Sequence, residues 1–125
     1  MGWLGGERRI VAVESEGCAT LATALAEGPE AEIEVTGVAA NALGARRIGM
    51  SCYELAVEHE IATITVSDAQ IIAAQRLLWH ELRQLVEPAG ATALAALHSG
   101  AYRPEPGERV AVLICGANPM PDPLA

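Results

Sequence analysis

A cysteine closes the last apolar run of the chain, and small residues follow it. The stretch RVAVLICGANP places Cys115 at the end of that run and Gly116 directly after it. A thiol is a weak hydrogen-bond donor, glycine allows a backbone to approach a ligand closely, and Asn118 suits a turn. An isolated cysteine is more often a small buried apolar residue than a site residue. The glycine and asparagine after Cys115 favour a site, so the pattern alone indicates a binding site of unknown ligand and no more.

Two acidic residues are further candidates for chemistry. Glu87 precedes a proline in LVEPAG, and Glu14 follows the apolar run IVAV. The simple structural interpretation makes each of them a solvated acid at the end of a helix or a strand. Spacing alone favours that interpretation for Glu87. The alternative for Glu87 is an acid held at a site beside a helix of small residues.

The histidines do not form a metal-binding pattern. His59, His80 and His98 are too far apart in the sequence to share a metal motif. The stretch HELRQ resembles a zinc-protease helix only superficially, because Gln84 stands where the second ligand is needed. We therefore interpret all three as ordinary surface histidines. The chain also contains no nucleophile elbow, Walker loop or dinucleotide-binding glycine motif.

The elements that would position these residues alternate between strands and helices. Short apolar runs rich in β-branched residues predict three buried strands, at 10–13, 61–66 and 110–115. Helical patterns predict four helices, at 20–27, 50–59, 67–87 and 88–99. Ser67 and Gln70 form a capping box at the start of the third helix, while Pro88 and Gly100 bound the fourth. This order predicts an α/β fold with a mainly parallel sheet flanked by helices.

Parallel strands would bring three residues to one edge of the sheet. Glu14, Ser67 and Cys115 stand at the carboxyl ends of the three predicted strands. Ligands of open α/β sheets bind outside the carboxyl ends of the strands. We therefore expect these three residues to lie on one rim.

Composition limits the class of protein. The chain has 125 residues, 51% of them hydrophobic, and a net charge of −8 with eight arginines and no lysine. An acidic chain without a basic cluster argues against nucleic acid and against an anionic membrane surface as partners. Three irregularly spaced cysteines give no disulfide framework. The first residues, MGWLGGERR, have the wrong order for a signal peptide, so we expect a cytoplasmic protein.

Three stretches together resemble a known family. VAVESEGCATLATALAEG, LVEPAGATALAAL and RVAVLICGAN, in this order, resemble the C-terminal part of the pyridoxal-phosphate-dependent L-serine/L-threonine dehydratases, or ammonia-lyases. The resemblance covers Ile10 to about Asn118 and implies part of the large domain of a fold type II enzyme, with a tryptophan-synthase-β-like fold. We therefore expect residues 1–118 to be a truncated C-terminal portion of that domain and residues 119–125 to be a tail.

The resemblance implies a cofactor site. In this family the residue matching Cys115 faces the pyridine nitrogen of pyridoxal phosphate, and Gly116 and Glu87 match residues near the ring. A thiol or hydroxyl cannot stabilise a protonated ring nitrogen as a carboxylate would, and this suits β-elimination over transamination. The implied reaction of the parent enzyme removes water from a hydroxy amino acid, serine or threonine, and deaminates it to a 2-keto acid.

The resemblance also implies a cation site. The family's metal ligands match the carboxylate of Glu14, the carbonyl of Cys18 and the side chain of Thr20, with further carbonyls from Leu43 and Ala45. One carboxylate among neutral oxygens suits a hard cation of low charge. Members that favour a divalent ion tend to carry aspartate where this chain has Thr20, so a monovalent cation such as potassium is the expected ion.

The chain departs from the family pattern in two respects. It contains neither the lysine that forms the Schiff base nor the glycine-rich phosphate loop, and it begins where the helix after that loop would end. We therefore expect no catalysis by this chain alone. Three hypotheses stay open: a C-terminal fragment of a dehydratase that is a homodimer, one half of a split enzyme completed by an N-terminal chain, or a non-catalytic binding or interaction module.

Overall fold

Two parallel strands form the sheet at the centre of the fold. The computed structural model describes residues 8–118, and in it β1 (Val11–Ser15) pairs with β2 (Ala62–Val66). Their register places Val11 opposite Ala62. Both strands are rich in β-branched residues, which pack well on a pleated, half-buried surface. The first two predicted strands are therefore confirmed, with boundaries shifted by one or two residues.

Helices account for most of the remaining regular structure in residues 8–118. Their bounds are η1 (Glu16–Cys18, a 3-10 turn), α1 (Thr20–Glu27), α2 (Ala40–Leu43), α3 (Met50–Glu58), α4 (Asp68–Leu82) and α5 (Pro88–Ser99). The helices predicted at 20–27, 50–59 and 88–99 are confirmed. The short helix α2 was not predicted, because one turn of ANAL is too short to show a periodicity.

The start of α4 follows the sequence signals, but its end does not. Ser67 and Gln70 form the predicted capping box. The helix ends at Leu82, five residues before the predicted end. Arg83 takes a left-handed conformation with φ of 55°, and its guanidinium donates to the carbonyls of Trp79 and His80. The Trp79 carbonyl also accepts the Arg83 backbone N–H, and the side-chain bond gives the His80 carbonyl a partner at the end of the helix. The helix therefore ends without a proline or a glycine.

The prediction of a third strand is wrong. Residues 110–115 form no strand, and Leu113, expected in the core, is 74% exposed. A strand exists only through hydrogen bonds to a neighbouring strand. None of the residues between 8 and 118 supplies that neighbour, so an apolar run of suitable composition remains without regular structure. The predicted tail, residues 119–125, and the first seven residues lie outside the described part of the chain.

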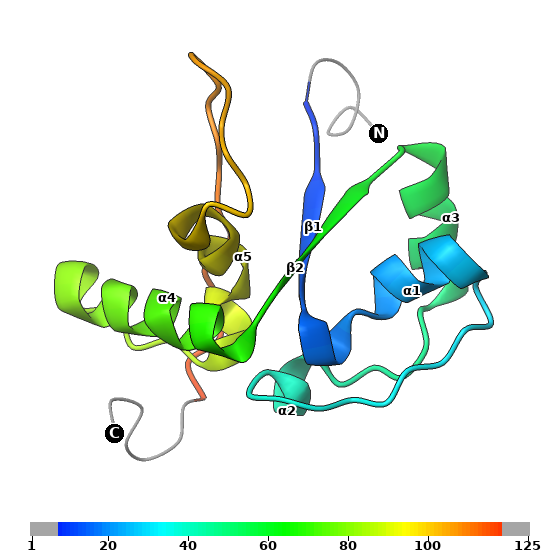
Figure 1. The fold of residues 1–125 in the computed structure, drawn as a ribbon, viewed down its shortest axis with the longest axis horizontal. Helices are drawn as coiled ribbons and strands as arrows, with labels where there is room; N and C mark the ends of the chain where they lie inside the picture. Colours follow the sequence, from blue (N-terminus) through cyan, green and yellow to red (C-terminus); the bar gives the residue numbers. More distant parts are fainter. Residues whose placement is uncertain (1–7, 119–125) are drawn as a thin grey trace.

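The sheet is covered on both sides, as the predicted α/β class requires. In Figure 1, α4 and α5 lie on one side of the two strands and α1 and α3 on the other. The helix α5 contacts β1, β2 and α4, and its alanines allow close approach. The core is aliphatic and contains Ala39, Val66, Ile71, Ala74, Leu78, Val86, Ala91, Ala95 and Ala96. Within the described residues, no helix combines the length and the apolar character needed to cross a membrane.

Candidate functional site

The backbone of Cys115 and Gly116 lies against the start of α5. Glu87 donates its backbone N–H to the Gly116 carbonyl across 3.1 Å, and Cys115 donates its N–H to the Gly90 carbonyl across 3.4 Å. Gly90 is buried, and a Cβ at this position would overlap the Cys115 carbonyl. Glycine at position 90 therefore lets the two segments, predicted separately from the sequence, meet at backbone distance.

The carboxylate of Glu87 occupies the space beside Gly116. Gly116 has a φ of +75°, and a Cβ there would meet the Glu87 carboxylate. Glu87 is the N-cap residue of α5, but its side chain does not cap the helix. The thiol-bearing residue Cys115 is exposed and Glu87 is half-buried. The contact therefore brings an exposed cysteine segment and the Glu87 carboxylate to the amino-terminal, positive end of α5.

The structure brings three of the predicted cation-site residues into one region. Glu14 lies within β1, and its two carboxylate oxygens accept the backbone N–H groups of Leu21 and Ala22, at 2.8 and 2.9 Å. Thr20 is buried and donates its hydroxyl to the Ala45 carbonyl across 2.7 Å. Glu14 therefore interacts with the first turn of α1, and Thr20 ties that turn to the segment after α2.

The remaining two predicted cation-site residues flank this region. Leu43 is the last residue of α2 and packs on the core. Cys18 is buried at the end of η1, and its thiol donates to the Thr36 carbonyl at 3.4 Å. Burial raises the pKa of the Cys18 thiol, so this group is a neutral, structural thiol and not a reactive one.

A groove of about 460 Å³ lies at the carboxyl ends of the two strands. It is lined by Glu16, Gly17, Thr36, Gly37, Ser67, Asp68 and Ala69. Of the three residues expected on one rim, Ser67 lines the groove. Glu14 lies two residues before the lining residue Glu16, and Cys115 is not among the lining residues. Thr36 and Gly37 were not predicted as site residues, because a loop between two predicted helices carries no periodicity. The Thr36 N–H donates to the Gly17 carbonyl across 2.9 Å and fixes this loop on η1.

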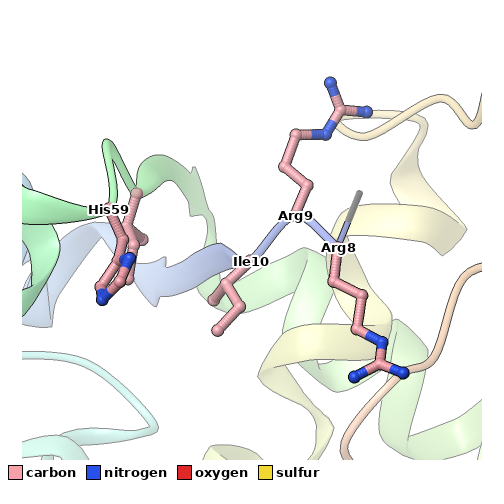
Figure 2. A pocket seen from close by; sticks show the side chains of 5 residues that line it. Arg8, Arg9, Ile10 and His59 are labelled. Atoms are coloured by element: carbon pink, nitrogen blue, oxygen red, sulfur yellow. The ribbon is translucent and has the colours of Figure 1, made fainter. Parts of the chain in front are cut away.

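A smaller pocket near the start of β1 has a basic lining. It has a volume of about 90 Å³ and is lined by Arg8, Arg9, Ile10, His59 and Ile61. Figure 2 shows that Arg8 and Arg9 point in opposite directions and that His59 lies on the far side of Ile10. The cationic groups do not converge, so this pocket is not an anion site. All three histidines are exposed, as predicted.

A polar cluster that was not predicted ties the two ends of the described chain together. One nitrogen of the Arg9 guanidinium donates to Glu108 at 3.1 Å and to the Tyr102 hydroxyl at 3.3 Å, and that hydroxyl donates to Glu108 at 2.5 Å. The Glu105 N–H also donates to Glu108, at 2.9 Å. These bonds lower the pKa of the Glu108 carboxyl, and the bond to Glu108 raises the pKa of Tyr102.

Known proteins are similar to this chain in sequence and in fold. The family model described as pyridoxal-phosphate dependent enzyme matches residues 2–116. The biosynthetic L-threonine dehydratase of Escherichia coli is 35% identical over 111 residues, which are 88% of this chain and 22% of that protein. The serine dehydratase-like protein of Mus musculus is 35% identical over 118 residues, which are 87% of this chain and 36% of that protein.

Solved structures show the same relationship. The crystal structure of a threonine deaminase from T.th. superposes with a TM-score of 0.63 at 30% identity, over 77% of this chain and 36% of that chain. This neighbour is a fold type II enzyme, which agrees with the α/β class observed here. The chain spans between about a fifth and somewhat over a third of the length of these relatives.

Proposed function

Because this chain belongs to the pyridoxal-phosphate-dependent enzymes and its relatives are threonine and serine dehydratases, we propose that it forms the ring-nitrogen side of a cofactor site in an L-threonine/L-serine ammonia-lyase. The observation that carries this proposal is the backbone contact between the Cys115–Gly116 segment and the start of α5. This contact brings the backbone of Cys115 close to Gly90 and the Glu87 side chain close to Gly116. Cys115 and Glu87 match the two residues that the family resemblance assigns to the surroundings of the ring.

The residue types at this contact support a role at one edge of pyridoxal phosphate. The exposed thiol of Cys115 is a neutral, weak donor suited to an uncharged ring nitrogen. When bound, the cofactor supplies an electron sink for loss of the α-proton and the β-hydroxyl of a hydroxy amino acid. In this proposal Cys115 contacts the ring nitrogen, Glu87 orients the ring, and Gly116 allows both to come close.

The other half of the chemistry has to come from outside these 125 residues. The sequence contains no lysine, so it has no amine for the covalent link to the cofactor and no lysine base for the α-proton. We propose that this chain is inactive alone and contributes to a complete site with the glycine-rich phosphate loop and the lysine of the remaining enzyme. That remainder is either continuous with this sequence or a complementary N-terminal chain, in an enzyme that forms a homodimer.

A monovalent cation such as potassium is the proposed ion at the strand end. The oxygen ligands that support it are the Glu14 carboxylate, the Thr20 hydroxyl and the Ala45 carbonyl. A hydrogen bond of 2.7 Å joins the last two. The carbonyls of Cys18 and Leu43 would complete the set. A site with one carboxylate and several neutral oxygens suits an ion of low charge. There the cation would join the start of α1 to the segment after α2.

The test of the proposed function combines DNA sequence and reconstitution. We expect the DNA upstream of the Met1 codon, or a neighbouring gene, to encode a lysine motif and a glycine-rich loop. The purified chain joined to that segment should form 2-keto acid from serine or threonine with added pyridoxal phosphate, whereas the chain alone should form none. A stop codon upstream without a partner gene, or turnover by the chain alone, would contradict the proposal.

The absence of lysine also favours a second candidate function. A non-catalytic binding or interaction module could keep the fold without the reaction. It predicts neither an upstream lysine motif nor turnover after reconstitution, so the same experiment separates the two. For either function we propose a cytoplasmic location, which the three free cysteines support, because reducing compartments keep thiols unpaired.

A further inference from the structure

Residues 83–87 connect α4 to α5 through a short link without helical structure. The Gln84 N–H donates to the Leu78 carbonyl across 3.1 Å, at the end of α4. Further along the link, Val86 is only 7% exposed and belongs to the core. From the middle of α4, the Gln75 side-chain amide reaches across and donates to the Val86 carbonyl at 2.8 Å. The Gln75 side chain therefore fixes the link to α4, although Gln75 and Val86 are eleven residues apart in the sequence.

The bond from Gln75 acts on the peptide unit that precedes Glu87. The Val86 carbonyl and the Glu87 N–H belong to the same planar peptide group, so fixing the oxygen also fixes the direction of the N–H. That N–H donates to the Gly116 carbonyl at 3.1 Å. The peptide group between Val86 and Glu87 is thus bonded through its oxygen to α4 and through its N–H to the Cys115–Gly116 segment.

We propose that Gln75 is a positioning residue for the site formed by Glu87, Cys115 and Gly116. It acts on these residues through the Val86–Glu87 peptide. The Gln75 amide donates to a carbonyl that has no other hydrogen-bond partner among residues 8–118. Without this bond the peptide can rotate, and the N–H that meets Gly116 loses its fixed direction. The functional meaning of this role rests on the proposed cofactor site, but the geometry itself is testable without cofactor.

The experiment measures amide hydrogen exchange by NMR on the full chain without cofactor. In Gln75→Met, which keeps the bulk and removes the donor, we expect the amides of Glu87 and Cys115 to exchange about five- to tenfold faster, as loss of one hydrogen bond allows. Amides of the core of α5, such as Ala95, should keep their rates. Gln84→Met is the matched control, because Gln84 is exposed on the same link and its side chain holds no carbonyl there.

A second variant keeps the test valid if Gln75→Met does not fold. Gln75→Glu has a similar shape, but its side chain donates to the Val86 carbonyl only when it is protonated. Protection at Glu87 and Cys115 should therefore be near the original level at low pH and fall as the new carboxyl ionises. If Gln75 only stabilised the fold as a whole, its substitution would raise the exchange rates of all core amides by the same factor. Uniform acceleration, or unchanged exchange at Glu87, would overturn the positioning role and leave the ring-edge proposal untouched, since no cofactor is present.

Discussion

The backbone N–H of Glu87 donates to the Gly116 carbonyl across 3.1 Å, while the Glu87 carboxylate fills the space that a side chain at position 116 would need. This pair joins the start of α5 to a segment far along the chain. Backbone and side chain of one residue thus define both where Gly116 lies and why it has to be glycine. The candidate cofactor site depends on this relationship more than on any strand.

Gly90 should be more sensitive to substitution than its helical position suggests. Alanine is normally favoured over glycine inside a helix by about 1 kcal/mol, but a Cβ at this position would overlap the Cys115 carbonyl. We expect Gly90→Ala to lower the free energy of unfolding by about 2 kcal/mol, because overpacking of backbone cannot be relieved by a side-chain rotation. Urea denaturation measures it, with Gly49→Ala as control, since a Cβ at Gly49 meets no atom within 4 Å. Equal stability of the two variants would contradict the contact.

The Glu108 cluster should make stability depend on pH in the acid range. Hydrogen bonds from Tyr102, the Glu105 N–H and Arg9 lower the pKa of the folded Glu108 carboxyl. A lowered pKa means that the contribution to stability is complete above the ordinary carboxyl pKa and is lost as pH falls through the folded value. Glu108→Gln should flatten this part of the pH profile in thermal unfolding. The exposed Glu30→Gln, which breaks only a surface ion pair with Arg47, serves as control and should leave the profile nearly unchanged.

Potassium should stabilise the chain through Thr20. We expect the melting temperature to be higher in potassium chloride than in choline chloride at equal ionic strength, and Thr20→Val or Glu14→Ala to remove the difference. Thr20→Val should also cost about 1 kcal/mol, the value of the lost hydrogen bond to the Ala45 carbonyl. Thr23→Val is the matched control, because its hydroxyl donates to the carbonyl of Ala19, at the start of its own helix. A potassium response that survives in Thr20→Val would count against the cation site.

Cys115→Ala should affect the cofactor more than the fold. The residue is exposed, so we expect a change in the free energy of unfolding within about 0.5 kcal/mol. In the reconstituted enzyme, however, the absorbance of bound pyridoxal phosphate and the turnover should both change. Cys52→Ala is the control, since Cys52 is exposed on α3. An unaltered spectrum and rate in Cys115→Ala would exclude the contact with the ring nitrogen.

Local signals predicted the elements that depend on neighbours in the sequence. The capping box at Ser67, the proline at the start of α5 and Gly100 at its end are all where the sequence indicated. The end of α4 was missed, because a non-glycine residue, Arg83, takes the left-handed conformation there. No residue type marks that position in advance.

Long-range contacts could not be predicted from the pattern of the chain. The ion pair of Arg9 with Glu108 joins residues 99 positions apart, and neither residue is unusual in its own segment. In the same way, the bond from Gln75 to the Val86 carbonyl follows from how α4 lies against the link to α5. Both depend on packing, which periodicity does not encode.

The sequence by itself determined the class of the fold, both paired strands and most helices, because these depend on residue types and their local spacing. It also indicated the family, through the resemblance of three stretches to known dehydratases. Only the tertiary structure decided that residues 110–115 form no strand and that Cys115 reaches α5 through the glycines at 90 and 116. The physical reason is that a strand needs a neighbouring strand, and this site needs contact between backbone segments that are far apart in the sequence. Hydrogen bonds between segments supply both, and an apolar run cannot specify them alone.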